Sequence, residues 1–329
     1  MTIFHKRRLI QEGDLCLFYI SRDSVRPVRV QAGKSFQSRF GQVQHASVIG
    51  RPFGAQIPST NRRGFVHVLR PTPELWTLSL PHRTQVVYTP DAAVIASMLR
   101  LRPGSRLIEA GTGSGSFSHA ALRSILPHGH LYTYEFHETR ASVAQAEFEE
   151  HGFQPDTLTL THRDVCVDGF GLEEEEEEDV QATAVFLDLP APWLAIPKLA
   201  PLLKPDYAVR MCCFSPCMEQ VQRTVEEMRQ SGWTDVVMVE IQHRANEARR
   251  QQVRGVEDAF ARIRLVRHKR AHGLHLARDG EDPPPKEDRA GRGVREGDPN
   301  FEWLQVSREE DKAKTHTSYL TFATRSPVS

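Results

Sequence analysis

The feature that most constrains the fold of this chain is a glycine-rich turn at residues 109–116, with the sequence Glu-Ala-Gly-Thr-Gly-Ser-Gly-Ser. A short apolar run precedes the turn, and a segment of helical character follows it over 117–126. A second apolar run then ends on Glu135, about 20 residues after the turn. In α/β folds with this order of elements, the glycines let the backbone approach a nucleoside, and the acid accepts hydrogen bonds from both ribose hydroxyls. The sequence therefore predicts a doubly wound sheet that binds an adenosine-containing cofactor.

The spacing of the glycines indicates which cofactor this is. Dinucleotide-binding turns follow the pattern G-x-G-x-x-G. Here Gly111, Gly113 and Gly115 stand behind Glu109 and form E-x-G-x-G-x-G, which resembles the first motif of S-adenosylmethionine-dependent methyltransferases. Two alternatives stay open at this point. One is a nicotinamide oxidoreductase with Ser116 at the third position of the dinucleotide pattern, and the other is a glycine turn without a ligand.

The charge of the chain is unevenly distributed although the net charge is zero. Residues 1–90 hold 13 Lys and Arg against four Asp and Glu, and residues 244–270 hold nine against three. Much of the compensating acid lies in the run 173–179. Two basic regions beside a cofactor domain favour a polyanionic substrate such as nucleic acid. The alternative is that these charges serve only solubility.

Several classes are excluded by what the sequence lacks. It has no run of 18 apolar residues and no apolar N-terminal stretch of signal-peptide type, so we expect an intracellular protein without a membrane span. Five cysteines without a regular framework indicate reduced thiols. Cys213 and Cys217 lack the spacing of a zinc pair, so we predict no metal site and expect the cysteines to be small buried residues.

Two domains are predicted, 1–76 and 77–329. The first shows alternating polar and apolar residues in short runs broken by glycines, which is typical of a small all-β domain. From 77 onward, helices and strands alternate, which predicts a seven-stranded Rossmann-like methyltransferase sheet. Segments 233–241 and 319–323 are expected to form its closing antiparallel pair.

Three segments of the second domain depart from this alternation. The glutamate-rich stretch 172–180 predicts an inserted acidic loop, and the composition of 275–299 predicts a disordered insertion. Apolar residues near 253–266 follow helical spacing among arginines. This helix is expected either to bind RNA or a partner, or to be a plain solvated helix.

A second acid ends the predicted strand at 183–188, where the chain reads Asp188-Leu-Pro-Ala-Pro-Trp193. The carboxyl end of such a strand faces the crevice in which doubly wound sheets bind ligands, and the prolines stiffen the loop. Asp188 can accept a proton from an exocyclic amine while a ring nitrogen attacks a methyl group, and Trp193 offers an aromatic face. The alternative is that Asp188 caps the strand and Trp193 lies in the core.

Together these segments resemble the catalytic subunits of the eukaryotic tRNA (adenine-N1)-methyltransferases that act on adenine 58 of the T-loop. The most selective matches are Arg70-Pro-Thr-Pro-Glu-Leu-Trp76 and Asp188-Leu-Pro-Ala-Pro-Trp193, and the match spans nearly the whole chain except the glutamate run and roughly 246–300. The resemblance implies S-adenosyl-L-methionine as cofactor and tRNA as substrate. It also implies a heterotetramer with a related non-catalytic subunit, and nuclear residence, with which the basic cluster at 6–8 agrees.

The resemblance assigns roles by position, with Asp188 as the catalytic residue. The cofactor-binding residues it implies are Val87, Glu109, Gly111, Gly113, Ser114, Gly115, Ser116, Glu135, Arg140, Asp164, Val165 and Asp188. The residues it implies for RNA are Lys34, Arg39, Phe40, Gln85, Tyr88, Thr89, Pro190, Trp193, Phe214 and Ser215. Two alternatives remain: the non-catalytic subunit, in which the glycine turn and the acid of the fourth strand are expected to be lost, and a methyltransferase for another RNA site.

Overall fold

The structure is a computed structural model. It describes residues 3–4, 7–21, 24–80, 86–171, 180–242, 246–252, 303–309 and 318–327, together with the single positions 256, 260, 263, 264 and 267. Contacts divide the chain into two compact units, Met1–Gln242 with Lys314–Ser329, and His243–Ala313. Outside the described residues lie Gln85, the predicted insertion at 275–299, and all of the predicted acidic insertion at 172–180 except Val180.

The described residues between Arg7 and Arg70 form antiparallel β structure, as predicted. A four-stranded sheet has the order β2-β1-β6-β5, and β3 pairs with β4 in a separate two-stranded sheet. The strands are β1 (Leu15–Ser21), β2 (Ser24–Arg29), β3 (Ser35–Ser38), β4 (Gly41–Gln44), β5 (Gln56–Pro58) and β6 (Phe65–Leu69), with a 3₁₀ helix η1 (His45–Ser47). Apolar side chains such as Cys16, Phe18 and Val68 are fully buried between these elements.

A helix that we did not predict begins at the expected junction. Helix α1 (Pro73–Ser79) has Pro73 in its first turn, and the Thr72 hydroxyl accepts a hydrogen bond from the Leu75 amide at 3.3 Å. Both features are ordinary start signals of a helix. The sequence therefore contains the start signal of a helix at the position where the predicted domain boundary lies.

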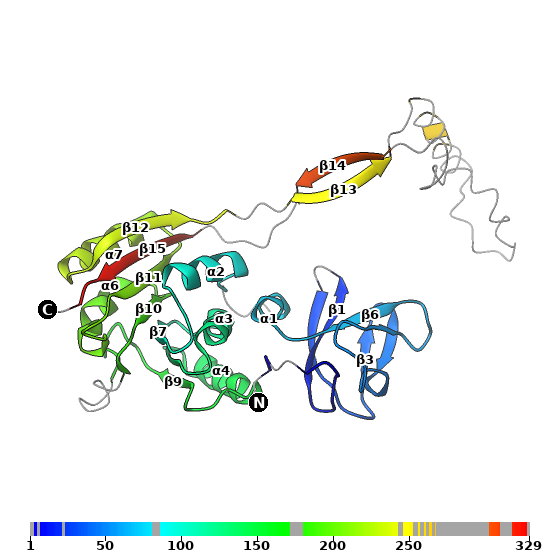
Figure 1. The fold of residues 1–329 in the computed structure, drawn as a ribbon, viewed down its shortest axis with the longest axis horizontal. Helices are drawn as coiled ribbons and strands as arrows, with labels where there is room; N and C mark the ends of the chain where they lie inside the picture. The colour runs from blue at the N-terminus through cyan, green and yellow to red at the C-terminus, as the bar shows by residue number, and fades with distance from the viewer. Residues whose placement is uncertain are drawn as a thin grey trace, which may run out of the picture. The chain divides into compact units, whose positions relative to one another are not determined.

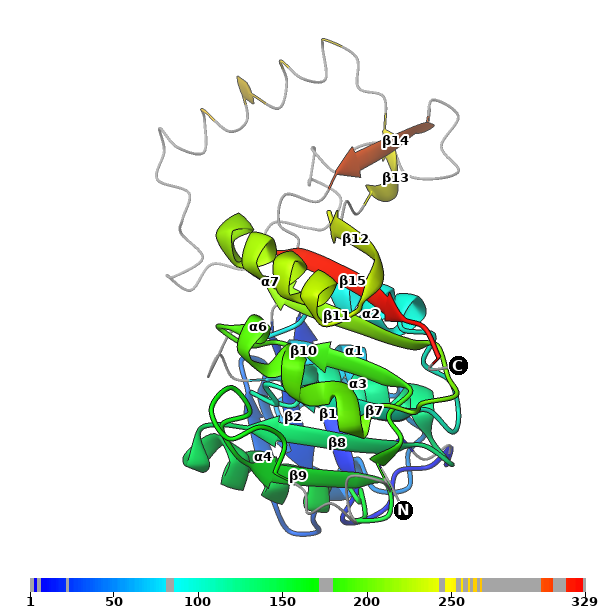
Figure 2. The ribbon, with the colours of Figure 1, turned by 90° about the vertical axis from the view of Figure 1, so that its left-hand side faces the viewer.

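The larger sheet confirms the predicted fold class. Its seven strands have the order β12-β15-β11-β10-β7-β8-β9, and Figure 2 shows them side by side. All pairs from β11 to β9 are parallel, whereas β15 is antiparallel to both β11 and β12. The strands are β7 (Arg106–Ala110), β8 (His130–Glu135), β9 (Leu158–His162), β10 (Ala184–Leu187), β11 (Val209–Ser215), β12 (Thr234–Glu240) and β15 (Tyr319–Arg325).

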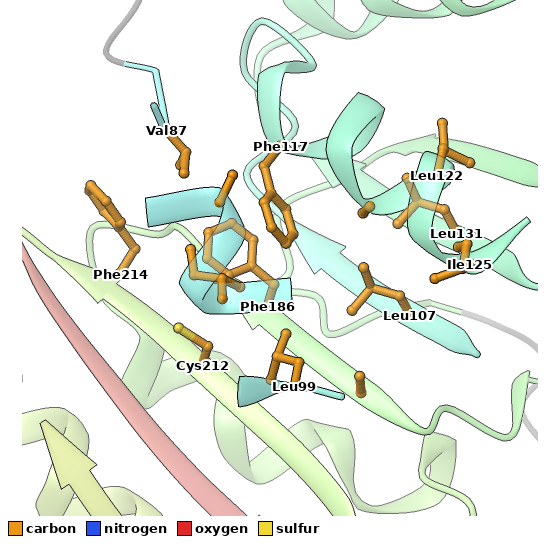
Figure 3. Packing of buried hydrophobic residues seen from close by; sticks show 14 of the residues in the cluster. Val87, Leu99, Leu107, Phe117, Leu122, Ile125, Leu131, Phe186, Cys212 and Phe214 are labelled. Atoms are coloured by element: carbon orange, nitrogen blue, oxygen red, sulfur yellow. The ribbon is translucent and has the colours of Figure 1, made fainter. Parts of the chain in front are cut away.

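Helices cover both faces of this sheet, because neighbouring strand residues point to opposite sides. Leu107 belongs to the core beneath α2, α3 and α4, whereas Ile108 belongs to the core beneath α6, η2 and α7. Figure 1 shows the two sets of helices on the two sides of the sheet. In the first core, Phe117 of α3 packs against Phe186 of β10 (Figure 3). Their ring centroids are 4.2 Å apart. The helices are α2 (Thr89–Met98), α3 (Ser116–Ile125), α4 (Glu138–Glu150), α6 (Pro192–Ala195), η2 (Ile196–Leu202) and α7 (Met218–Gln230).

The second unit holds a pair of strands that we did not predict. β13 (Asn246–Gln252) pairs antiparallel with β14 (Trp303–Glu309). The basic segment 244–270 therefore begins as a strand, and the helix predicted at 253–266 is confirmed at its described positions, among them Val256, Phe260 and Ile263. The polar run 246–252 has no alternation that predicts a strand, and its partner is far away in the sequence.

Candidate functional site

The glycine turn brings the ends of β7 and β10 into contact. Gly111 follows β7 with a φ of +98°, and a Cβ atom at this position would lie 2.2 Å from the carbonyl oxygen of Asp188. The Asp188 amide in turn donates to the carbonyl of Ala110 at 2.8 Å. Only glycine combines this backbone conformation with such a close approach. The turn and the acid after β10 therefore form one site.

Glu135, at the end of β8, is almost fully buried and is held by several donors. One carboxylate oxygen accepts from the Gly113 amide at 2.8 Å. The other accepts from the His137 amide at 2.9 Å and from the Arg140 guanidinium at 2.7 and 3.1 Å. The oxygen bound to Gly113 keeps a free lone pair, since a carboxylate oxygen has two. Glu135 is thus fixed in position and still able to accept a hydrogen bond from a ligand.

Asp188, unlike Glu135, has a carboxylate that no donor of the described residues holds. Its carboxylate is half-buried and, among the described residues, has no hydrogen-bond or ion-pair partner. Burial, with a smaller contribution from the negative charge of Glu135, raises the pKa of Asp188 to about 7. A carboxylate near neutrality at a strand end, with no internal partner, is suited to exchange a proton or to accept one hydrogen bond from a ligand.

Glu109 lies beneath the turn. One of its oxygens accepts from the hydroxyls of Ser118 and Thr133 at 2.7 and 2.8 Å, which ties β7 to α3 and β8. Its other oxygen is buried without a partner among the described residues. Burial raises the pKa of Glu109 to about 7, with smaller contributions from Asp188 and Glu135. Its predicted contact with the cofactor stays a prediction, because Glu109 does not line the cavity described next.

A cavity of about 990 Å³ opens between the ends of β7, β8 and β10. Nine predicted site residues line it: Gly111, Gly113, Glu135, Arg140, Asp164, Val165, Asp188, Pro190 and Phe214. Other residues that line it, among them Phe136, Leu194 and Gln220, were not predicted. Phe136 and Leu194 are 64% and 47% exposed, which is unusual for large apolar side chains. Phe136 directly follows Glu135, so its place next to the acid was a signal available in the sequence.

The loop after β9 forms one wall of this cavity. The Asp164 carboxylate accepts from the amides of Cys166 and Val167 at 2.9 and 3.3 Å, an Asx turn. The Lys198 ammonium donates to the carbonyls of the same two residues at 2.6 and 2.9 Å. Arg163 donates to the carbonyls of Asp168 and Gly169. Two basic side chains, Lys198 and Arg163, therefore hold the backbone of residues 166–169 in this wall.

Several predicted cofactor residues lie around the turn without lining the cavity. The Ser116 hydroxyl donates to the carbonyl of Val87 at 2.8 Å and pairs with the Thr77 hydroxyl at 2.8 Å. It thereby joins α3 to α1 and to the segment before α2. Ser114 is buried within the turn, and Gly115 caps α3 with a φ of +69°.

The predicted RNA residues are spread more widely. Trp193 stacks under the Arg223 guanidinium, 5.4 Å from the ring centroid, and does not line the cavity, because the short helix α6 turns it toward α7. Ser215 is buried at the end of β11. Tyr88 and Thr89 form the start of α2. Lys34 and Arg39 are exposed residues of the N-terminal β structure, where the Arg39 guanidinium covers the ring of Phe40.

The five cysteines differ in their burial. Cys16, Cys212 and Cys213 are buried as expected, whereas Cys166 is half-buried and Cys217 is exposed, so the prediction of uniformly buried cysteines is wrong. Cys217 is exposed because it precedes α7 as its N-cap. Among the described residues, no cluster of three or more His, Cys, Asp or Glu side chains is arranged to hold a metal ion. In the same part of the chain, no helix has the length and apolar character needed to cross a membrane.

Two solved structures have folds similar to that of this chain. Over 99% of the chain, it is similar to the "SAM-dependent O-methyltransferase" from Thermotoga maritima, with 22% identity, a TM-score of 0.69 and 98% of that structure covered. It is also similar to the "tRNA (m1A58) methyltransferase TrmI" from Aquifex aeolicus, with 21% identity, a TM-score of 0.64, and 96% of this chain and 98% of that one covered. At these identities the two structures support the fold alone.

Curated relatives are more similar in sequence. The "tRNA (adenine(58)-N(1))-methyltransferase catalytic subunit TRM61" of Candida albicans is 46% identical over 99% of both chains. The protein of the same description from Schizosaccharomyces pombe is 41% identical, over 99% of this chain and 97% of that one. The family described as "tRNA methyltransferase complex GCD14 subunit" matches residues 64–325. This chain is therefore a member of that family.

Proposed function

We propose that this chain transfers a methyl group from S-adenosyl-L-methionine to N1 of adenine 58 in the T-loop of tRNA, as the catalytic subunit of a complex with a related subunit. The observation that carries this proposal is that Glu135 and Asp188 line one cavity on either side of the glycine turn. The first acid is bound by donors and the second is not. This is the arrangement expected when one acid holds a cofactor and the other meets a substrate.

The cavity fits such a donor. Its volume of about 990 Å³ is at the upper end of the usual range for ligand sites, which leaves room for a nucleoside and for a second base. Glu135 keeps an acceptor for a ribose hydroxyl, and Asp164 and Val165 line the wall predicted for the adenine of the cofactor. When bound, the donor supplies an electrophilic methyl carbon on a positively charged sulfur.

The residues of the chain then act by position and by charge. N1 lies on the Watson–Crick edge of adenine, so the base must leave its partners before it can react. The base gains positive charge as N1 forms its new bond, and the Asp188 carboxylate stabilises this charge or takes a proton from the exocyclic amine. Phe136, Leu194 and Phe214 add apolar surface around the same space.

The non-catalytic subunit is the alternative that the site argues against. Such a subunit has no need of an open cavity between the turn and two acids. This chain retains Gly111, Gly113 and Gly115, and Gly111 is required by the close approach of Asp188. We therefore favour the catalytic role.

The experiment is mass spectrometry of nucleosides from a tRNA incubated with this chain, its expected partner and a labelled donor. We expect labelled 1-methyladenosine from the unmodified tRNA and none from a tRNA with guanine in place of adenine 58. Another labelled nucleoside in place of 1-methyladenosine would contradict the choice of site. We also propose that this complex is a heterotetramer, and light scattering of the purified complex of this chain and its partner tests the proposed stoichiometry.

Nuclear residence is a separate proposal, supported by the resemblance and by the basic cluster at 6–8. Lys6 lies outside the described residues. Arg7 forms an ion pair with Asp14 at 2.7 Å, so this residue also has a structural partner. Microscopy of a fluorescent fusion, with Lys6 and Arg8 replaced by glutamine, tests whether the cluster directs the protein to the nucleus.

A further inference from the structure

The loop that carries Asp188 sets the direction of its carboxylate. The carboxylate has no side-chain partner among the described residues, so its direction depends on the backbone of residues 187–190. On one side this backbone is held by the bond from the Asp188 amide to Ala110 and by contact with Gly111. The part of the loop that follows Asp188 requires a separate contact to hold it.

Gln220, on the first turn of α7, binds this other side. Its side-chain amide nitrogen donates to the carbonyl of Pro190 at 2.9 Å. Its side-chain oxygen accepts from the amide of Cys217 at 3.2 Å, as part of a capping box at the start of α7. The two bonds fix the orientation of the side-chain amide, because only its nitrogen can donate and only its oxygen can accept. Gln220 therefore connects a helix start to the loop of the reactive acid.

Gln220 is also placed where such a connection matters. It is half-buried and lines the same cavity as Asp188, Pro190 and Phe214. The prolines at 190 and 192 stiffen the loop, so a bond at the Pro190 carbonyl transmits its restraint toward Asp188. The next carbonyl, of Ala191, is bound to the Leu194 amide within the start of α6 and offers no comparable link to α7.

We propose that Gln220 is a positioning residue for methyl transfer: by holding the Pro190 carbonyl, it fixes the direction of Asp188 toward the target base. This inference rests on the proposed function. It separates two roles of one side chain, the helix cap made by its oxygen and the loop anchor made by its nitrogen. Misplacement of a reacting group by about 1 Å can cost on the order of 10²-fold in rate, so a loosened loop has a measurable effect.

The test uses the full chain in complex with its partner. Gln220→Glu has the same shape and keeps an acceptor for the Cys217 amide, but it cannot donate to Pro190. Gln220→Met removes both bonds without adding a charge. Gln222→Glu, at an exposed position of the same helix, is the matched control for the added charge. Turnover, cofactor affinity, thermal stability and amide exchange of peptide 187–194 are measured for each.

We expect kcat to fall about tenfold in both Gln220 variants, with faster exchange of peptide 187–194 and cofactor affinity within about twofold of the unmodified protein. Gln220→Glu keeps the melting temperature, and Gln220→Met lowers it slightly by loss of the cap. Gln222→Glu leaves all four measurements unchanged.

Two results would overturn the inference. One is unchanged kcat and exchange in both variants, which would leave Gln220 as a helix cap only. The other is a fall in kcat without faster exchange, which would mean that Gln220 contacts the substrate itself. If the unmodified protein made no 1-methyladenosine, the proposed function would fail, and the exchange data would still decide whether Gln220 holds the loop.

Discussion

The two acids of the cavity differ in almost everything except their place at a strand end. Glu135 accepts from four N–H groups, whereas the Asp188 carboxylate has no partner among the described residues. An acid that is held by its own protein is ready to bind a fixed group, because its geometry is set before the ligand arrives. An acid without partners keeps its hydrogen-bonding capacity and a pKa near neutrality, which suits a group that changes charge during a reaction.

The most severe test of this comparison removes the charge of Asp188. We expect Asp188→Asn to lower kcat on the order of 10²-fold or more while cofactor affinity changes little, because the amide cannot stabilise a positive base or take its proton. Single-turnover kinetics and isothermal titration calorimetry measure the two quantities. Asp206→Asn, an exposed acid between β10 and β11, is the control. Normal turnover in a folded Asp188→Asn protein would remove this residue from the mechanism.

The same change at Glu135 is expected to affect binding instead. Glu135→Gln removes an ionised acceptor that faces Arg140, and hydrogen bonds to charged groups contribute about 1.5–3 kcal/mol. We therefore expect cofactor affinity to fall by roughly 10- to 100-fold, with kcat at saturating cofactor much less affected. Calorimetry with the cofactor measures the change. A variant with normal affinity and poor kcat would reverse the roles assigned to the two acids.

The pH dependence of kcat/KM sharpens the comparison further. Asp188 has its pKa raised to about 7, so below this pH the carboxyl is protonated and cannot accept. We expect kcat/KM to rise about tenfold between pH 6 and pH 8, as the free protein loses this proton. Glu109 titrates in the same range, so the midpoint belongs to the coupled pair. A flat profile in the unmodified protein, or an unchanged rise in Asp188→Asn, would contradict this assignment.

The smallest expected effect concerns the wall of the cavity beyond Glu135. Lys198→Met removes the donor to the carbonyls of Cys166 and Val167, which loosens the loop predicted to flank the cofactor adenine. We expect cofactor affinity to fall by roughly three- to tenfold, because the lost bonds order the loop and do not themselves contact the cofactor. Lys204→Met, on the connection before β11, is the matched control. Equal cofactor affinities of the two variants would show that the loop after β9 keeps its position without the bonds of Lys198.

The elements that were predicted and those that were missed differ in the range of the signal. β7, the turn and β8 lie within 30 residues of one another. Their apolar runs and glycines form a local sequence pattern, from which the order of these elements and the acid Glu135 could be predicted. β13 and β14 could not, since a polar strand and a distant partner leave no pattern in either segment. Helix α1 begins with Thr72 and Pro73, a start signal that lies in the segment where the predicted domain boundary falls.

By itself, the sequence determined the doubly wound sheet, the turn and the presence of an acid at the ends of β8 and β10. These follow from local periodicity and from residue types that few other structures need. Only the tertiary structure decided that Gly111 packs against Asp188, that Glu135 is bound and Asp188 is not, and that Trp193 faces Arg223 while Gln220 holds Pro190. The contacts of Gly111, Trp193 and Gln220 join residues about 30 to 80 positions apart, and their partners are chosen by packing and hydrogen-bond geometry in three dimensions, which no local pattern encodes.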